Sequence, residues 1–207
     1  MPHKVGLAAR ELSCQRGGRL VFQGVSFGLA PGEALLVTGP NGAGKTSLLR
    51  QIAGLLPLTA GELHVEGGGP DAALPELCHY VGHLNAVKAN LSIRENLVFW
   101  AEYFAAHTVK LDRALEAFGL AALADAPAGL LSAGQKRRLA LSRLFAAPRP
   151  IWLLDEPQAS LDAASIKLLD TAIEGHIESG GIAVVASHVP SKTKFAHQLK
   201  LGGKRAP

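Results

Sequence analysis

The sequence contains few cysteines and no apolar run long enough to cross a membrane. Its two cysteines, Cys14 and Cys78, lack the spacing of metal-ligand pairs and indicate a reducing compartment more than a disulfide scaffold. The longest apolar runs, such as residues 34–37 and 182–186, are strand-sized, whereas a membrane-spanning helix needs about 20 residues. The first residues lack the apolar stretch of a secretory signal. We therefore expect a soluble, cytoplasmic protein, or one that a partner holds at a membrane.

Aromatic residues and an excess of one charge are also scarce. Aromatic residues make up 5% of the chain, and 21 Lys and Arg against 17 Asp and Glu give a net charge of +4. Nucleic-acid-binding surfaces combine clustered basic residues with interleaved aromatic ones; the sequence shows no such cluster, so we expect no nucleic-acid partner. The mild positive charge fits a nucleotide site or an anionic membrane face. The length and the 48% of hydrophobic residues predict that residues 1–207 form a single domain.

Apolar patterns predict strands in the first 65 residues, helices in the middle, and an alternation of the two in the last third. The expected strands cover residues 25–29, 34–37, 63–65, 151–154 and 182–186. Helices are expected within about 84–147, with capping boxes that begin at Ser92 and Ser132, and again over 164–177. A final hairpin is expected around 199–204. Strand–helix–strand order at these lengths predicts an α/β fold with a parallel sheet.

Residues 39–46 form a complete phosphate-binding motif, Gly-Pro-Asn-Gly-Ala-Gly-Lys-Thr. Its glycines allow a tight turn in which several backbone N–H groups point at one phosphate chain. Lys45 would reach the β- and γ-phosphates of a nucleotide, and the hydroxyl of Thr46 would hold Mg²⁺. A buried strand precedes the loop and a helix follows it, so the helix N-terminus faces the phosphates. The residues expected to bind the nucleotide here are Gly39, Pro40, Asn41, Gly42, Ala43, Gly44, Lys45, Thr46 and Ser47.

Two carboxylates, Asp155 and Glu156, follow the apolar run 151–154. A buried strand that stops there places Asp155 at the carboxyl edge of the sheet, where ligands bind in open α/β folds. Asp155 would hold Mg²⁺, and Glu156 would polarise the water that attacks the γ-phosphate. Alone, the pair would be explained as a solvated turn. Its place about 110 residues after a phosphate loop predicts a nucleotide-hydrolysing site instead.

Three further motifs lie between and after these two. Residues 131–135, Leu-Ser-Ala-Gly-Gln, resemble the signature motif of the ABC ATPases, with Ala133 where Gly is usual. The helix that they begin would offer free N–H groups to an anion. Residues 159–162 resemble the D-loop, and Ser187-His188 resembles the switch histidine. From its sequence the chain is therefore identified as a member of the ABC ATPases, and the resemblance covers nearly its whole length.

That resemblance implies a P-loop α/β core with an N-terminal antiparallel β part and a helical lobe at about 84–147. It implies ATP and Mg²⁺ as cofactors, and a head-to-tail homodimer in which each ATP lies between the phosphate loop of one subunit and the signature motif of the other. Beyond the phosphate loop, the implied nucleotide contacts are Ser132, Gly134, Gln135, Asp162 and Arg16. The implied catalytic residues are Lys45, Glu156, His188 and His83, and the implied metal ligands are Thr46 and Asp155.

The chain departs from the family pattern at two positions. His83 lies where a Gln usually contacts Mg²⁺ or the attacking water, and as a neutral imidazole it could accept a hydrogen bond from either. Residues 14–17 read Cys-Gln-Arg-Gly where an aromatic residue usually stacks on adenine. Arg16 could stack its planar guanidinium on the base or remain solvated.

These departures, the short chain and the signature Leu-Ser-Ala-Gly-Gln-x-Arg-Arg at 131–138 resemble the ATP-binding subunit of the haem exporter of bacterial cytochrome c maturation. That resemblance implies a peripheral protein on the cytoplasmic face of the bacterial inner membrane. Its partners would be integral transporter subunits and a haem-handling membrane protein, and we expect them to contact the segment 83–95. No haem ligation by this chain is expected, because the sequence has no C-x-x-C-H attachment motif and no pair of axial ligands.

Other functions remain open at this point. The main alternative is an ABC export ATPase for another substrate, such as a drug or a lipid. An ABC protein that acts on DNA or ribosomes would carry a long coiled-coil insertion or a second cassette, and the sequence has a single phosphate loop and no heptad run. A regulator that binds nucleotide without hydrolysing it is disfavoured because Lys45, Asp155, Glu156 and His188 are all present.

Overall fold

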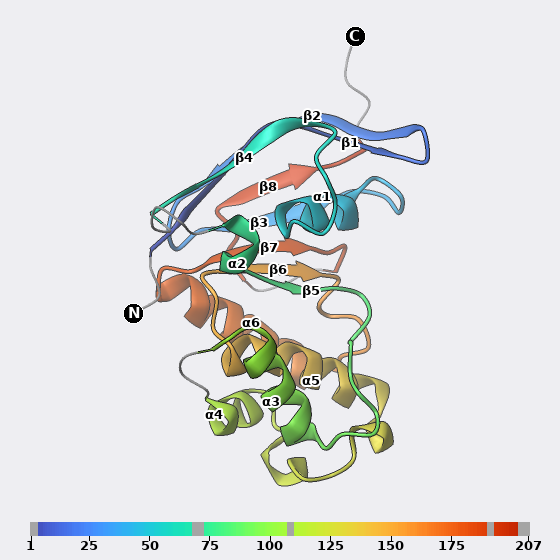
Figure 1. Ribbon diagram of the computed structural model, residues 1–207, viewed down its shortest axis with the longest axis vertical. Helices are drawn as coiled ribbons and strands as arrows, with labels where there is room; N and C mark the ends of the chain where they lie inside the picture. Colours follow the sequence, from blue (N-terminus) through green and yellow to red (C-terminus); the bar gives the residue numbers. More distant parts are fainter. Residues whose placement is uncertain (1–3, 68–72, 107–109, 190–192, 203–207) are drawn as a thin grey trace.

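The computed structural model describes residues 4–67, 73–106, 110–189 and 193–202. It consists of an antiparallel sheet, a parallel sheet and a group of helices that lie one below another in Figure 1. No helix in these ranges is long and apolar enough to span a bilayer. The α/β fold with an antiparallel part, a parallel core and helices, predicted from the sequence, is confirmed.

The parallel sheet has five strands in the order β5-β6-β7-β3-β8. These strands are β3 (Ala34–Thr38), β5 (Cys78–Val81), β6 (Ile151–Asp155), β7 (Ile182–Ala186) and β8 (His197–Lys200). Every residue of β6 and β7 is buried, which is why both read as continuous apolar runs without alternation. Strands β3, β6 and β7 therefore bring their carboxyl ends, Thr38, Asp155 and Ala186, to one edge of the sheet.

The antiparallel sheet has the order β2-β1-β4. Its strands are β1 (Gly6–Arg16), β2 (Arg19–Leu29) and β4 (Ala60–Glu66). Strands β1 and β2 form a hairpin whose turn contains Gly17 and Gly18, both with positive φ, a conformation that glycine adopts without strain. Helix α1 (Lys45–Ile52) packs between this sheet and the parallel one (Figure 1).

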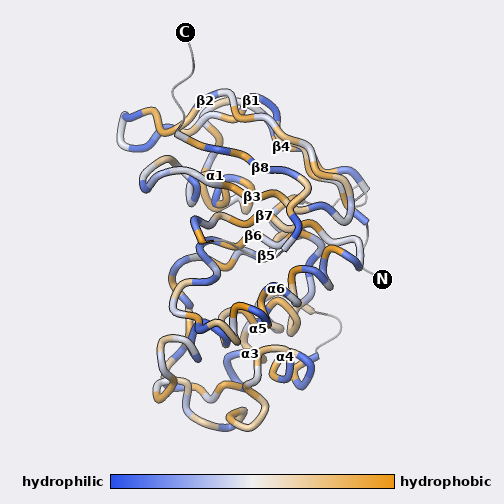
Figure 2. Tube along the Cα trace, turned by 180° about the vertical axis from the view of Figure 1, so that it is seen from behind, coloured by the Kyte–Doolittle hydropathy of each residue, from blue (hydrophilic) through white to orange (hydrophobic). Residues whose placement is uncertain are grey.

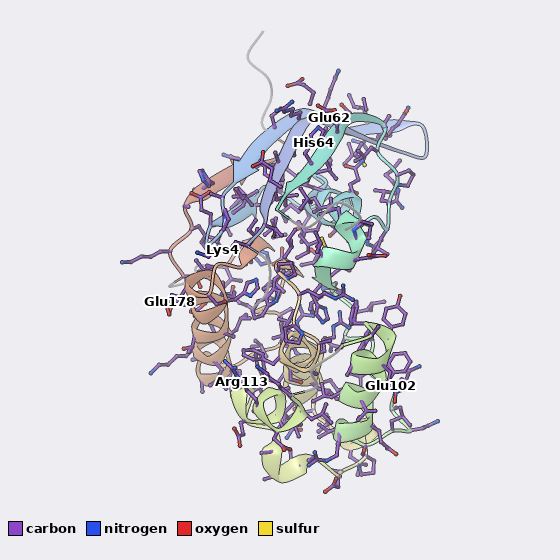
Figure 3. All side chains as sticks on the ribbon, turned by 60° about the vertical axis from the view of Figure 1, so that its left-hand side comes forward. Lys4, Glu62, His64, Glu102, Arg113 and Glu178 are labelled. Carbon is purple, nitrogen blue, oxygen red and sulfur yellow. The ribbon has the colours of Figure 1, made fainter. Side chains whose placement is uncertain are left out.

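The remaining helices lie within residues 74–178. They are α2 (Leu74–Leu77), α3 (Ile93–Tyr103), α4 (Leu111–Ala117), η1 (Ala121–Leu123), η2 (Ala128–Leu130), α5 (Ala133–Ala146) and α6 (Ala163–Glu178). Both predicted capping boxes are present: the hydroxyls of Ser92 and Ser132 accept hydrogen bonds from the third helical N–H of α3 and α5. In Figure 3 the side chains fill the space between the sheet and these helices, while labelled charged residues such as Glu102 and Glu178 lie at the surface.

Two hydrophobic cores lie on opposite faces of the parallel sheet. Alternate residues of β6 divide between them: Ile151 and Leu153 face α1 and the antiparallel sheet, whereas Trp152 and Leu154 face α3 to α6. Figure 2 shows hydrophobic residues along the central strands that separate the two cores. This division leaves the carboxyl edge of the sheet as the place where both halves of the molecule can contribute polar groups.

The predicted strands are confirmed, but two expectations are not. The segment 84–92, placed in the helical region, contains no helix, because α3 begins at its cap Ser92. The hairpin predicted around 199–204 is wrong where it can be assessed. Leu199 and Lys200 belong to β8, which pairs in parallel with β3, and residues 203–204 lie outside the described ranges.

Candidate nucleotide-binding site

The phosphate loop connects β3 to α1 at the carboxyl edge of the parallel sheet. Gly44 is the N-terminal cap residue of α1 with φ of 101°, and Gly39 has φ of 140°. A Cβ on Gly39 would collide with the carbonyl oxygen of Leu201, just after β8, so only glycine fits there. Lys45 is buried, and its ammonium donates hydrogen bonds to the carbonyl oxygens of Gly39 (2.9 Å) and Pro40 (3.4 Å). The loop is thus already closed around its own lysine.

A cavity of about 300 Å³ opens at this loop. Its lining residues are Val21, Asn41, Gly42, Gly44, Lys45, Thr46, Ser47, Asp155 and Glu156. All but Val21 belong to the two motifs that the sequence predicts to hold the phosphates and the metal. The structure therefore brings together residues that are about 110 positions apart in the chain.

Asp155 ends β6 and accepts two hydrogen bonds at the floor of this site. The hydroxyl of Thr46 donates to Oδ1 over 3.2 Å, and the hydroxyl of Tyr80 donates to Oδ2 over 3.3 Å. Tyr80 in turn accepts from Nε of Arg50 over 3.4 Å. Burial raises the pKa of Tyr80, so it remains a proton donor to the carboxylate near neutral pH. The Asp155 carboxylate is held by partners from β5 and α1.

Glu156 follows β6 and turns into the cavity. Its φ of 46° lies in the left-handed region, which costs a non-glycine residue about 1–2 kcal/mol. Its N–H donates to the carbonyl oxygen of Ala186 over 2.8 Å, which anchors the turn to the end of β7. Its carboxylate lies 4.0 Å from Nζ of Lys45 and 3.1 Å from Nδ1 of His188. Three of the four predicted catalytic residues thus meet at one carboxylate.

The signature motif lies elsewhere on the chain. Gln135 donates its N–H to the Ser132 hydroxyl over 3.2 Å and accepts from the Ser132 N–H over 2.9 Å, which begins α5. A Cβ on Gly134 would lie 2.9 Å from the carbonyl oxygen of Ser160, so this helix end packs directly on the segment before α6. Asp162 caps α6, and hydrogen bonding with Ser165 lowers the pKa of Asp162. None of these residues lines the cavity formed by the described part of the chain.

His83 and Arg16 also lie outside the cavity lining. Both are exposed, and within the described ranges neither side chain makes a hydrogen bond or an ion pair. Arg16 ends β1, next to the hairpin turn, while Val21 on the neighbouring strand reaches the cavity. The structure therefore places neither residue in the lining of the phosphate-loop cavity.

Three residues contact this site although the sequence analysis assigned none of them a role there. Val21 lines the cavity, Tyr80 holds Asp155, and Arg137 hydrogen-bonds to the backbone carbonyls of Asp155 and Glu156. Arg137 belongs to the signature stretch 131–138 and Tyr80 lies three residues before His83, but nothing in the local sequence indicates their contacts. Their roles become visible only once distant segments are brought together.

Comparison with known proteins defines the class. The sequence profile of the ABC transporter family matches residues 22–159. The fold matches that of a putative ABC transporter ATP-binding protein from Pyrococcus furiosus with a TM-score of 0.81 over 95% of this chain and 97% of that one, at 23% sequence identity. The chain therefore belongs to the ABC transporter family, as one of its ATP-binding proteins.

Individual relatives within that family share about half of their residues with the chain. The cytochrome c biogenesis ATP-binding export protein CcmA of Chelativorans sp. is 51% identical over 95% of this chain and 98% of its own length. The protein of the same name from Rhodospirillum rubrum is 55% identical over 87% of this chain and 79% of its own length. That of Rhodopseudomonas palustris is 50% identical over 95% of this chain and 98% of its own length.

Proposed function

We propose that the chain is the ATP-hydrolysing subunit of a membrane export complex for cytochrome c biogenesis. The observation that carries the hydrolysis is the meeting of Lys45, Glu156 and His188 at the mouth of the phosphate-loop cavity. In this arrangement Lys45 and His188 contact the carboxylate that would act as the base. Bound ATP would place its γ-phosphate against Lys45 and His188 and leave Glu156 to the attacking water.

The residues at the cavity floor fit Mg²⁺. Thr46 and Asp155 offer a hydroxyl and a carboxylate oxygen only 3.2 Å apart, and Mg²⁺ prefers oxygen donors and takes the rest of its ligands from water and phosphates. No group of three or more His, Cys, Asp or Glu side chains exists in the described ranges that would suggest a different metal site. When bound, Mg²⁺ would neutralise phosphate charge.

The chain's own groups account for the proton transfer. Glu156 would take a proton from water as the water oxygen bonds to the γ-phosphorus and the bond to the ADP oxygen breaks in line. Lys45, fixed by the Gly39 and Pro40 carbonyls, would neutralise charge on the transferred group. Glu156→Gln keeps the size of the side chain and removes the base. We expect it to bind ATP but lose at least about 100-fold in turnover.

The signature motif has a place in this scheme only in a dimer. Ser132 and Gln135 lie at a helix N-terminus outside the cavity of their own chain, and such an end binds anions. We propose that they contact the ATP of a second copy in a head-to-tail homodimer. Size-exclusion chromatography of Glu156→Gln with and without ATP tests this. A monomer at saturating ATP would contradict it.

The relatives' names supply the process. Proteins called cytochrome c biogenesis ATP-binding export proteins share 46–55% of residues with this chain, which places haem delivery for c-type cytochromes ahead of drug or lipid export. Integral transporter subunits and a haem-handling membrane protein would be its partners, and they would hold it on the cytoplasmic face of the inner membrane. The segment 83–95 is the proposed contact; it includes Leu84, whose exposed fraction of 82% is high for a leucine.

The test replaces Lys45 by Ala in the native cell and stains gels for covalently attached haem. We expect loss of all c-type cytochromes while other haem proteins persist. Lys167→Ala, an exposed lysine on α6, is the matched control and should leave the stain unchanged. Normal levels of c-type cytochromes in Lys45→Ala cells would show that the protein does not act in cytochrome c biogenesis. The membrane subunits that co-purify with the protein would then indicate its process.

A further inference from the structure

Arg137 is a buried arginine whose contacts cross from the helices to the catalytic edge of the sheet. It lies on α5, five residues after the cap Ser132, and only 2% of its surface is exposed. Its guanidinium donates five hydrogen bonds. The acceptors are the carbonyl oxygens of Pro157 (3.0 Å), Gly82 (2.7 Å), Asp155 (3.0 Å) and Glu156 (2.9 Å), and Oδ1 of Asn85 (3.3 Å).

These acceptors belong to two segments that border the nucleotide site. Three are consecutive backbone carbonyls of the turn 155–157, which carries the catalytic carboxylate. The other two lie in residues 82–85, directly after β5. All five are uncharged oxygens, and only a planar fork with N–H groups on three nitrogens can reach them together. Burial lowers the pKa of Arg137, but an arginine still keeps its proton near neutral pH.

The turn 155–157, which Arg137 holds, contains a strained backbone conformation. Glu156 has a φ of 46°, and a strained backbone persists only where its surroundings over-determine it. Arg137 fixes the peptide carbonyls of Asp155 and Glu156, which lie on either side of the Glu156 Cα and N. The orientation of these two peptide planes sets the direction in which the Glu156 side chain leaves the backbone. The position of the base is therefore tied to a side chain from α5.

The neighbouring arginines of α5 make different contacts. Arg138 donates to the carbonyl oxygens of Phe118 (2.9 Å) and Gly119 (3.4 Å), both on the α4 side of the helices. Arg143 contacts the carbonyl oxygen of Tyr80 and lies over the ring of Trp100 at 4.3 Å. In the described part of the chain, Arg137 is thus the arginine of α5 that reaches the turn 155–157.

We propose that Arg137 is a positioning residue for ATP hydrolysis: its guanidinium sets the place of the Glu156 carboxylate and links it to α5 and to residues 82–85. This inference rests on the proposed ATPase function. It deepens that function by coupling the base to two other elements. Through Arg137, a displacement of α5 would move the Glu156 carboxylate. A displacement of residues 83–95, the segment proposed to contact the membrane subunits, would do the same. Arg137 itself does not contact the reacting atoms.

The test compares Arg137→Gln and Arg137→Lys with Arg149→Gln and Arg149→Lys in purified protein, because Arg149 donates to the carbonyl oxygen of Phe104 over 2.7 Å, away from the nucleotide site and the signature motif. A 1 Å misplacement at a reacting centre can cost about 100-fold, so we expect kcat to fall about 10- to 100-fold in both Arg137 variants. The ATP dissociation constant, measured with a fluorescent ATP analogue, should change less than about threefold, because the phosphate loop is untouched. Both Arg149 variants change a carbonyl contact of the same kind and should keep kcat within about twofold of the parent value.

A double variant separates positioning from general stability. If Arg137 acts through Glu156, then adding Arg137→Gln to Glu156→Gln should cost no further activity in a single-turnover assay, whereas independent effects would multiply. Three results would each overturn the proposal. The first is a kcat equal to that of the parent in both Arg137 variants. The second is a loss of activity fully explained by fewer ATP-binding sites, and the third is a double variant whose activity loss is the product of the two single losses. A parent protein without ATPase activity would instead reject the proposed function itself.

Discussion

The stacked pair of Trp152 and His176 predicts how stability depends on pH. The two rings lie 3.9 Å apart with an angle of 6° between their planes, on the face of β6 that meets the helices. Burial lowers the pKa of His176 from 6.5 to about 4. Its Nε2 lies 3.2 Å from the carbonyl oxygen of Ile182, and Gly181 lies so close to the ring that no Cβ would fit. The folded state therefore holds His176 as a neutral imidazole.

The sign and size of the effect follow from this pKa. Between about pH 6.5 and 4 the unfolded chain binds a proton at His176 that the folded protein refuses, so stability falls as the pH falls through this window. Each pKa unit of difference between the folded and the unfolded state corresponds to about 1.4 kcal/mol of unfolding free energy. The shift of His176 from 6.5 to about 4 therefore corresponds to a full loss of about 3 kcal/mol. His79 acts in the same direction. Burial, and then the nearby charge of Arg143, lower its pKa well below the ordinary value.

Urea denaturation at pH 7.0 and pH 5.0 measures the effect. His176 alone should lower the unfolding free energy of the parent by about 2 kcal/mol over this interval, and His79 should add to the drop. In His176→Phe, which keeps the stack, the drop should be smaller by about 2 kcal/mol. His197→Gln is the control, because His197 is half-exposed and paired with Glu33 at 3.1 Å. Equal pH dependence in the parent and His176→Phe would refute the argument.

Three shorter predictions concern single side chains. Tyr80→Phe leaves one oxygen of the buried Asp155 carboxylate without its donor and should cost about 1–3 kcal/mol of stability in urea, whereas the exposed Tyr103→Phe should cost almost nothing. Ser132→Ala and Ser92→Ala each remove a helix cap worth about 1 kcal/mol, but we expect only Ser132→Ala to reduce ATPase activity, since Ser92 caps a helix outside the proposed dimer contact. Burial raises the pKa of Cys78 to about 12, so the native thiol should resist iodoacetamide at pH 8 and react once the protein is denatured.

Local patterns were sufficient for most of the fold. Strands β6 and β7 are buried on both faces and read as plain apolar runs, while α3 and α5 begin at capping boxes that four residues define. The phosphate loop is equally local, since its shape depends on glycines at fixed spacing. The sequence predicted these features because each is encoded within a few consecutive residues.

Other features depend on partners that are far away in the chain. Strand β8 reads His-Gln-Leu-Lys, which carries no apolar run, and it is a strand because β3 offers it an open edge. Arg137 and Tyr80 reach the site through contacts that span 18 and 75 residues. Their neighbours in sequence carry no trace of these contacts. These contacts become evident only in the folded structure. In contrast, the order of the motifs was enough to predict that Glu156 and Lys45 belong to one site.

The order of the strands has a consequence for synthesis. The phosphate loop follows β3, but β3 takes both its neighbours, β7 and β8, from residues 182–200, more than 140 positions later. At about 5–20 residues per second, the ribosome needs roughly 7–30 s to deliver them. During that interval β3 has no strand to pair with and presents open edges to other nascent chains. ATP can therefore stabilise the fold by binding only after residues 182–200 have been synthesised. Protection by chaperones should matter most for nascent chains that contain β3 but not yet β7 and β8.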